Sequence, residues 1–277
     1  MKKAIMLLLC LAMTLGIKAG QALELKQVLN GTFSARTLNK VQPLADGESY
    51  AQVSPDRKSI EKYSFKTGQK TGILFDANTA KGSKVLSIDN YIMSPDESRI
   101  LIQTETESIY RRSLKAEYYI FTVKNNMLEP LSKNGKQQQP IFSPDGNQIA
   151  FARDNNLYLV KLLFNNSESP VTTDGKINEI LNGIPDWVNE EEFATSRSFD
   201  FSADGKMLAW IKYDESKVRT FNMTMYKGAA PANTQYAEYP GQYSYKYPVA
   251  GSVNSTVAVY SYDIKSHVTR QMNVPLE

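Results

Sequence analysis

The chain has 277 residues, with 32 basic and 29 acidic side chains, one cysteine and one histidine. Its formal charge of +3 is matched by Lys2, Lys3 and Lys18, which lie in a predicted leader, so the rest of the chain is close to neutral and gives no support to nucleic-acid or membrane-surface binding. Cys10 lies in the same leader, and the lone His267 cannot complete a zinc site. We therefore expect no disulfide, no thiolate nucleophile, no metal and no other cofactor.

The first 22 residues have the pattern of a secretory signal peptide. Lys2 and Lys3 form a basic start, residues 4–17 are an apolar stretch too short for a membrane span, and Gly-Gln-Ala at 20–22 supplies small residues for cleavage. This predicts cleavage after Ala22 and export to the periplasm or the extracellular space, with no membrane attachment afterwards.

Four short segments further along the chain share one pattern. Their serines are spaced by 40, 49 and 59 residues, and the segments are "AQVSPDRKSI" at 51, "YIMSPDESRILIQ" at 91, "PIFSPDGNQIAFAR" at 140 and "FDFSADGKMLAWIK" at 199. Ser-Pro-Asp-Gly suits a type I turn, since Pro fixes φ at the second position and Gly is favoured at the fourth. The alternating apolar residues that follow each turn predict a strand.

Further strands follow the turns, at "EYYIFTV" (117–123) and "NLYLVKL" (156–162). A hairpin with one or two more strands in 40–60 residues is typical of a β-propeller blade. No segment holds a helical apolar pattern over three turns, and only a short helical turn is expected near residues 190–193. The sequence thus predicts an all-β fold: residues 23–277 form an incomplete N-terminal β-propeller domain of about three to four blades of four-stranded antiparallel sheet.

The spacing between repeats lengthens toward the C-terminus because of two insertions, "DWVNEEEF" (186–193) and the Tyr-rich "YAEYPGQYSYKYP" (236–248). Three adjacent carboxylates cost little on a solvated surface. In a crowded pocket they need a cation, since two like charges about 4 Å apart repel by about 4 kcal/mol at an effective dielectric near 20.

Residues 183–218 and 247–260, with "KYSFKTGQKTGILFD" (62–76) and "IYRRSLKAEYYIF" (109–121), resemble the N-terminal propeller of the dipeptidyl peptidase IV family of prolyl-oligopeptidase-type serine peptidases. The resemblance implies that Glu191 and Glu192 bind the free α-ammonium of a peptide substrate and that Arg111 reaches a substrate carbonyl. Two carboxylates can satisfy the three donors of an ammonium. One departure from the motif is Asn189, at a position that is often aromatic.

The family's nucleophile lies in a Gly-x-Ser-x-Gly elbow of a C-terminal hydrolase domain, and this chain has no such motif. We therefore expect no catalytic residue here and no activity of the chain alone, whether it is an N-terminal fragment or the product of a truncated gene. The leading hypothesis is the substrate-gating, amine-recognising part of a secreted dipeptidyl peptidase that releases X-Pro or X-Ala dipeptides, with a homodimer as a possible state of the full-length enzyme. The alternative is a stand-alone periplasmic propeller-like module that binds a peptide or a protein.

Overall fold

The computed structural model describes residues 22–35, 40–229 and 232–275. The predicted signal peptide falls almost wholly on residues 1–21, outside this range. The chain divides into two compact units, residues 1–39 and 40–277. In the described part of the first unit, the short helix α2 (Leu25–Leu29) begins where the backbone N–H of Glu24 donates to Oε1 of Gln27 at 3.3 Å. This five-residue helix was not predicted, because it is shorter than the three turns over which an apolar pattern becomes visible.

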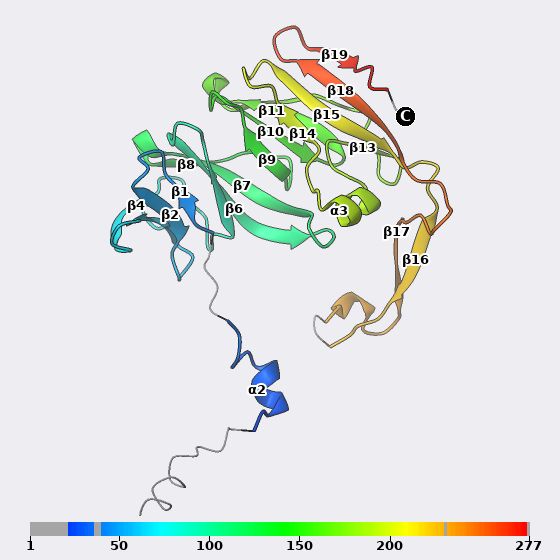
Figure 1. Ribbon diagram of the computed structural model, residues 1–277, viewed down its shortest axis with the longest axis horizontal. Helices are drawn as coiled ribbons and strands as arrows, with labels where there is room; N and C mark the ends of the chain where they lie inside the picture. Colours follow the sequence, from blue (N-terminus) through cyan, green and yellow to red (C-terminus); the bar gives the residue numbers. More distant parts are fainter. Residues whose placement is uncertain (1–21, 36–39, 230–231, 276–277) are drawn as a thin grey trace, which may run out of the picture. The chain divides into compact units, whose positions relative to one another are not determined.

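Within residues 40–229 and 232–275, the second unit consists of four antiparallel sheets and one two-stranded ribbon (Figure 1). The first sheet contains β1 (Gln42–Pro43), β2 (Ser49–Val53), β3 (Ser59–Ser64) and β4 (Lys70–Asp76). The second contains β5 (Asn90–Met93), β6 (Arg99–Ser108), β7 (Leu114–Thr122) and β8 (Met127–Pro130). The third contains β9 (Gln138–Phe142), β10 (Gln148–Arg153), β11 (Asn156–Lys161) and β12 (Ser167–Pro170).

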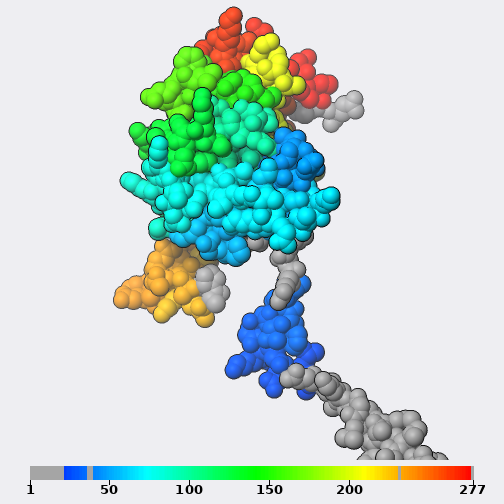
Figure 2. Space-filling view, turned by 90° about the vertical axis from the view of Figure 1, so that its left-hand side faces the viewer, coloured from blue at the N-terminus to red at the C-terminus, as the bar shows by residue number. Residues whose placement is uncertain are grey.

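The fourth sheet has β13 (Ile180–Asn182), β14 (Phe199–Phe201), β15 (Met207–Asp214), β18 (Thr256–Asp263) and β19 (Val268–Gln271). The ribbon is formed by β16 (Thr220–Met225) and β17 (Gly241–Lys246), and its orange surface projects from the stacked sheets in Figure 2. One α-helix, α3 (Trp187–Phe193), and three 3-10 turns complete the described part of this unit; the turns are Val123–Asn125, Leu162–Phe164 and Thr234–Tyr236. The all-β fold of several four-stranded antiparallel sheets is confirmed, and the predicted helical turn is present but begins three residues earlier.

The predicted serine turns are formed as the sequence indicates. In each, the fourth residue donates its backbone N–H to the serine carbonyl, at 2.8–2.9 Å. Each serine hydroxyl also donates to the aspartate two residues later, at 2.6–2.7 Å. The turn at Ser54 joins the second and third strands of its sheet, those at Ser94 and Ser143 join the first strand to the second, and that at Ser202 joins β14 to β15. The first sheet therefore has its serine turn one hairpin later than the second and third sheets do.

The sheets pack face to face, as propeller blades do. Along β6, Ile100 and Ile102 belong to the core shared with the first sheet, while Leu101 belongs to the core shared with the third. Likewise Ile149 of β10 contacts the second sheet, while Ala150 packs in the core shared with the fourth. A strand buried on both faces has apolar residues at successive positions, so these interior strands read as short apolar runs. Stacking between neighbouring sheets is thus the main source of the buried core.

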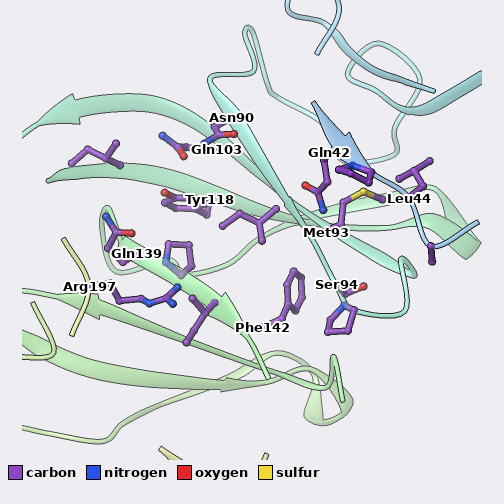
Figure 3. Close-up of a pocket in the computed structure, with 17 residues that line it drawn as sticks. Gln42, Leu44, Asn90, Met93, Ser94, Gln103, Tyr118, Gln139, Phe142 and Arg197 are labelled. Atoms are coloured by element: carbon purple, nitrogen blue, oxygen red, sulfur yellow. The ribbon is translucent and has the colours of Figure 1, made fainter. Parts of the chain in front are cut away.

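The first strands of three sheets converge on a cavity of about 730 Å³ (Figure 3). Its lining is rich in side-chain amides, from Gln42 of β1, Asn90 of β5, Gln103 of β6 and Gln139 of β9. Of the described residues that line it, none is one of the three glutamates of α3 or Arg111. The cavity marks the inner side of the blades and is separate from the residues that the sequence singled out.

Candidate functional site

The helix α3 lies in an insertion that interrupts one strand of the fourth sheet. β13 and β14 pair end to end with β15, at Asn182↔Lys212 and at Phe199↔Trp210. At the break, the Ser198 N–H donates to the Gly183 carbonyl at 2.7 Å, so the chain leaves the sheet and returns at the same point. Residues 184–197 therefore project from a closed and well-anchored junction.

Gly183 is required at this junction by both backbone and packing. Its φ is +73°, in the left-handed region that favours glycine. A Cβ atom there would lie 2.8 Å from Cδ2 of Leu157 and 2.9 Å from Cδ1 of Phe199. Glycine thus allows the insertion to leave the strand directly against the core.

The helix α3 is fixed at its first turn by Asp186. Its Oδ1 accepts the backbone N–H of Asn189 at 2.9 Å and the Asn189 side-chain amide at 2.8 Å. Its Oδ2 accepts the Ser255 hydroxyl, which ties the helix to the segment before β18. Asn189, the departure from the family motif, therefore contributes to the N-terminal cap.

The second part of the site is the tip of the β6–β7 hairpin, which reaches α3 in Figure 1. The tip is closed by the Ile109 N–H, which donates to the Ser113 carbonyl at 2.9 Å, and by the Tyr110 N–H, which donates to Oγ of Ser113 at 3.2 Å. Arg111 and Arg112 lie at the end of this loop and are exposed. The loop comes from the second sheet, whereas α3 comes from the fourth.

Glu190 joins these two parts. It is 1% exposed, and its Oε1 accepts the backbone N–H groups of Arg112 at 2.7 Å and Ser113 at 2.8 Å. Its Oε2 is also buried and has no hydrogen-bond partner among the described residues. The sequence predicts no separate role for Glu190, because its partners lie 77 and 78 positions away in the chain and give no local signal.

Of the three residues predicted to bind substrate, the structure brings two together. Nε of Arg111 lies 3.3 Å from Oε2 of Glu191; the arginine side chain is 74% exposed and that of the glutamate 13%. Glu192, the next residue of α3, is exposed and has no ion pair or hydrogen bond through its side chain within residues 22–35, 40–229 and 232–275. An ion pair with so exposed a partner contributes about 0–1 kcal/mol, so the Arg111–Glu191 contact by itself holds neither segment in place.

Aromatic rings pack around the same two segments. The ring of Tyr245 lies 6.2 Å from Tyr110 in the hairpin loop and 6.1 Å from Trp187 in α3, measured between centroids. Tyr247 lies 4.6 Å from Trp187 and 5.6 Å from Phe221 of β16. Burial raises the pKa of Tyr110, so its hydroxyl stays neutral. The Tyr-rich insertion therefore packs its base against the site, which the sequence did not reveal.

Glu215 is a second buried carboxyl in this region. It is 7% exposed, and burial together with repulsion from Asp186 raises its pKa to about 7, partly offset by Lys246. The Lys246 ammonium donates to the Val218 carbonyl at 2.6 Å, at the base of the ribbon. The carboxyl of Glu215 is thus poised to change charge near neutral pH.

Two general features bear on the chemistry of the site. Across residues 22–35, 40–229 and 232–275, no three His, Cys, Asp or Glu side chains come together in a way that could hold a metal ion. In the same part of the chain, no helix has the length and apolarity needed to cross a membrane. The groups that the site offers to a ligand are therefore carboxylates, guanidinium groups and aromatic rings.

Stacked four-stranded sheets with an acidic helical insertion place the chain in the class of β-propeller regions. Residues 94–277 match the family model described as Dipeptidyl peptidase IV (DPP IV) N-terminal region, and the chain belongs to this family. It is 31% identical over 248 residues to human Prolyl endopeptidase FAP, covering 88% of this chain and 30% of that protein. It is 33% identical over 285 residues to the Probable dipeptidyl-aminopeptidase B of Emericella nidulans, covering 94% and 30%.

Among solved structures, the crystal structure of Porphyromonas gingivalis dipeptidyl peptidase 4 is similar, with a TM-score of 0.86 and 38% sequence identity. The similarity covers 93% of this chain and 36% of that one. The chain therefore spans about 30% of the length of the curated relatives it matches. The resemblance inferred from residues 183–218 and 247–260 is confirmed at the level of the family.

Proposed function

We propose that this chain is the substrate-gating, amine-recognising propeller part of a secreted dipeptidyl peptidase. In this proposal Glu191 and Glu192 bind the α-ammonium of a peptide with a free N-terminus, and Arg111 contacts a substrate carbonyl. The observation that carries the proposal is the contact of Arg111 with Glu191, at 3.3 Å between Nε and Oε2. Two segments about 80 residues apart in sequence meet there with a mostly solvent-accessible guanidinium group.

The charges at this point suit the N-terminal end of a peptide, which carries an ammonium followed by a neutral carbonyl. An ammonium has three donors and one positive charge, so it can be satisfied by two carboxylates through charge-assisted hydrogen bonds. Glu191 and Glu192 are consecutive, and Glu192 has no partner among the described residues. Arg111 partly compensates the acidic pair and leaves donors free for an oxygen acceptor. A site that fixes the amine defines where the peptide enters, so that cleavage falls at a set number of residues from the N-terminus of the peptide.

The proposal is tested in a full-length peptidase that contains this chain. Glu191→Gln and Glu192→Gln should each lower kcat/KM for free-amine dipeptide substrates by more than about tenfold, since losing one partner of a desolvated charged pair costs about 2–5 kcal/mol. The matched control is Glu48→Gln, because Glu48 is an exposed carboxylate in the β1–β2 turn. Unchanged kinetics in both α3 variants would show that Glu191 and Glu192 do not bind the substrate amine.

Two associated expectations belong to the same proposal. Export with cleavage after Ala22 would be seen as a mature N-terminus at or near Leu23. The homodimer of the full-length protein stays a prediction, which light scattering on that protein would test.

A further inference from the structure

Glu190 is the most deeply buried member of the acidic run. It is 1% exposed, and the described residues provide no lysine or arginine side chain paired with it. Burying a carboxylate without a cation costs several kcal/mol unless hydrogen bonds replace its hydration. The two N–H bonds from Arg112 and Ser113 supply that replacement at Oε1, whereas Oε2 has no partner among the described residues; hydrogen bonds to a charged acceptor are about twice as strong as neutral ones.

These bonds set the register between the loop and the helix. Arg111 directly precedes the two donors, and Glu191 directly follows the acceptor. When Oε1 of Glu190 holds the N–H groups of residues 112 and 113, the side chain of Arg111 is brought against Glu191. The exposed Arg111–Glu191 pair is too weak to impose this arrangement. The order of the loop therefore comes from Glu190.

We propose that Glu190 is a positioning residue for the amine site. It touches no ligand. It fixes the Arg111 loop against α3, so that the guanidinium group and the carboxylate of Glu191 face one ligand together. This inference rests on the proposed function, and it assigns separate roles within the acidic run: the first carboxylate organises the site, and the next two bind.

The first test follows the amide protons in residues 23–277 labelled with ¹⁵N. In the unsubstituted chain, the amides of Arg112 and Ser113 should exchange with solvent at least about tenfold more slowly than that of Arg111, the preceding exposed loop residue, whose N–H has no hydrogen-bond acceptor among the described residues. Exchange as fast as that of an exposed amide would overturn the proposal without any variant, and so does not depend on whether a variant folds.

The second test compares two substitutions of nearly equal size. In Glu190→Gln the side-chain oxygen can still accept the two N–H bonds, whereas Glu190→Met has similar length and no such acceptor. In a full-length peptidase, the Met variant should raise KM for a free-amine dipeptide substrate by more than about tenfold. The Gln variant should raise this KM by less than about fivefold, so that its KM lies closer to the wild-type value than that of the Met variant does. Equal and wild-type KM values in both variants would overturn the positioning role.

The two proposals can fail separately. If Glu191→Gln impairs turnover while Glu190→Met has wild-type KM, the amine site stands and the positioning role falls. If Glu190→Met accelerates amide exchange at residues 112 and 113 while Glu191→Gln has wild-type kinetics, the loop is anchored but the site does not bind an amine. That second result would overturn the proposed function and, with it, the role inferred for Glu190.

Discussion

Replacing Gly183 with alanine should destabilise the fold and disturb the insertion that carries α3. At φ +73°, an L-residue costs about 1–2 kcal/mol relative to glycine. The added Cβ would also meet Leu157 and Phe199 at 2.8 and 2.9 Å, well inside the optimal carbon–carbon separation of about 3.5–4.0 Å. Overpacking of this kind costs about 1–3 kcal/mol. The expected loss in free energy of unfolding is therefore about 2–5 kcal/mol.

The control is Gly47→Ala. Gly47 has nearly the same backbone conformation, φ +68°, but a Cβ there meets nothing within 4 Å. This substitution should cost only the free energy of placing an L-residue in the left-handed conformation, about 1–2 kcal/mol. Urea unfolding of residues 23–277 at low protein concentration would measure both, using the fluorescence of the chain's two tryptophans, of which Trp187 lies in the insertion. If Gly183→Ala is no more destabilising than Gly47→Ala, the inference that the junction is too closely packed for a Cβ atom is wrong.

Four further predictions concern pH, assembly, catalysis and processing. The raised pKa of Glu215 means that the folded state binds a proton more tightly than the unfolded chain. The free energy of unfolding should therefore fall by about 2–3 kcal/mol as pH rises from about 4.5 to about 7. Glu215→Gln should flatten this dependence of stability on pH, and an unchanged dependence would contradict the assignment. The outer face of the fourth sheet has no neighbouring sheet among the described residues, and Val257 and Val268 are 37% and 43% exposed. Purified residues 23–277 should therefore associate as their concentration rises, which light scattering would measure. A monodisperse monomer would argue against this expectation. The same preparation should not hydrolyse a chromogenic X-Pro substrate, and inhibitor-sensitive turnover would overturn the non-catalytic interpretation. Mass spectrometry of the exported protein should find its N-terminus within a few residues of Leu23, whereas an intact Met1 form in the cytoplasm would refute the predicted leader.

Local patterns were sufficient to predict the sheets. The Ser-x-Asp turns act through hydrogen bonds between residues at most five apart, as at Ser143, whose hydroxyl donates to Asp145 and accepts the N–H of Gln148. Such contacts are readable from a few consecutive letters. The apolar runs of β6 and β10 were equally readable, and their burial on both faces explains why strict alternation is incomplete there. The short helix α2 was missed because five residues carry too little periodicity.

The candidate site was predictable only in part. The acidic run and Arg111 were found because they match a family motif, and the structure brings Arg111 and Glu191 to 3.3 Å. Nothing in the amino-acid sequence distinguishes Glu190 from the two glutamates that follow it. One turn of helix directs the three side chains differently, and only the packing of the hairpin tip against α3 makes the first of them buried.

The sequence by itself determined the serine turns, the strands beside them and the presence of an acidic insertion late in the chain. These properties depend on neighbouring residues, whose preferences act over a few bonds. The tertiary structure alone decided which carboxylate is buried against the hairpin loop, and that Tyr245 packs against both Tyr110 and Trp187. Those outcomes depend on segments 58 to 135 positions apart meeting at one place, and burial and hydrogen bonding there are set by the stacking of sheets rather than by any local preference.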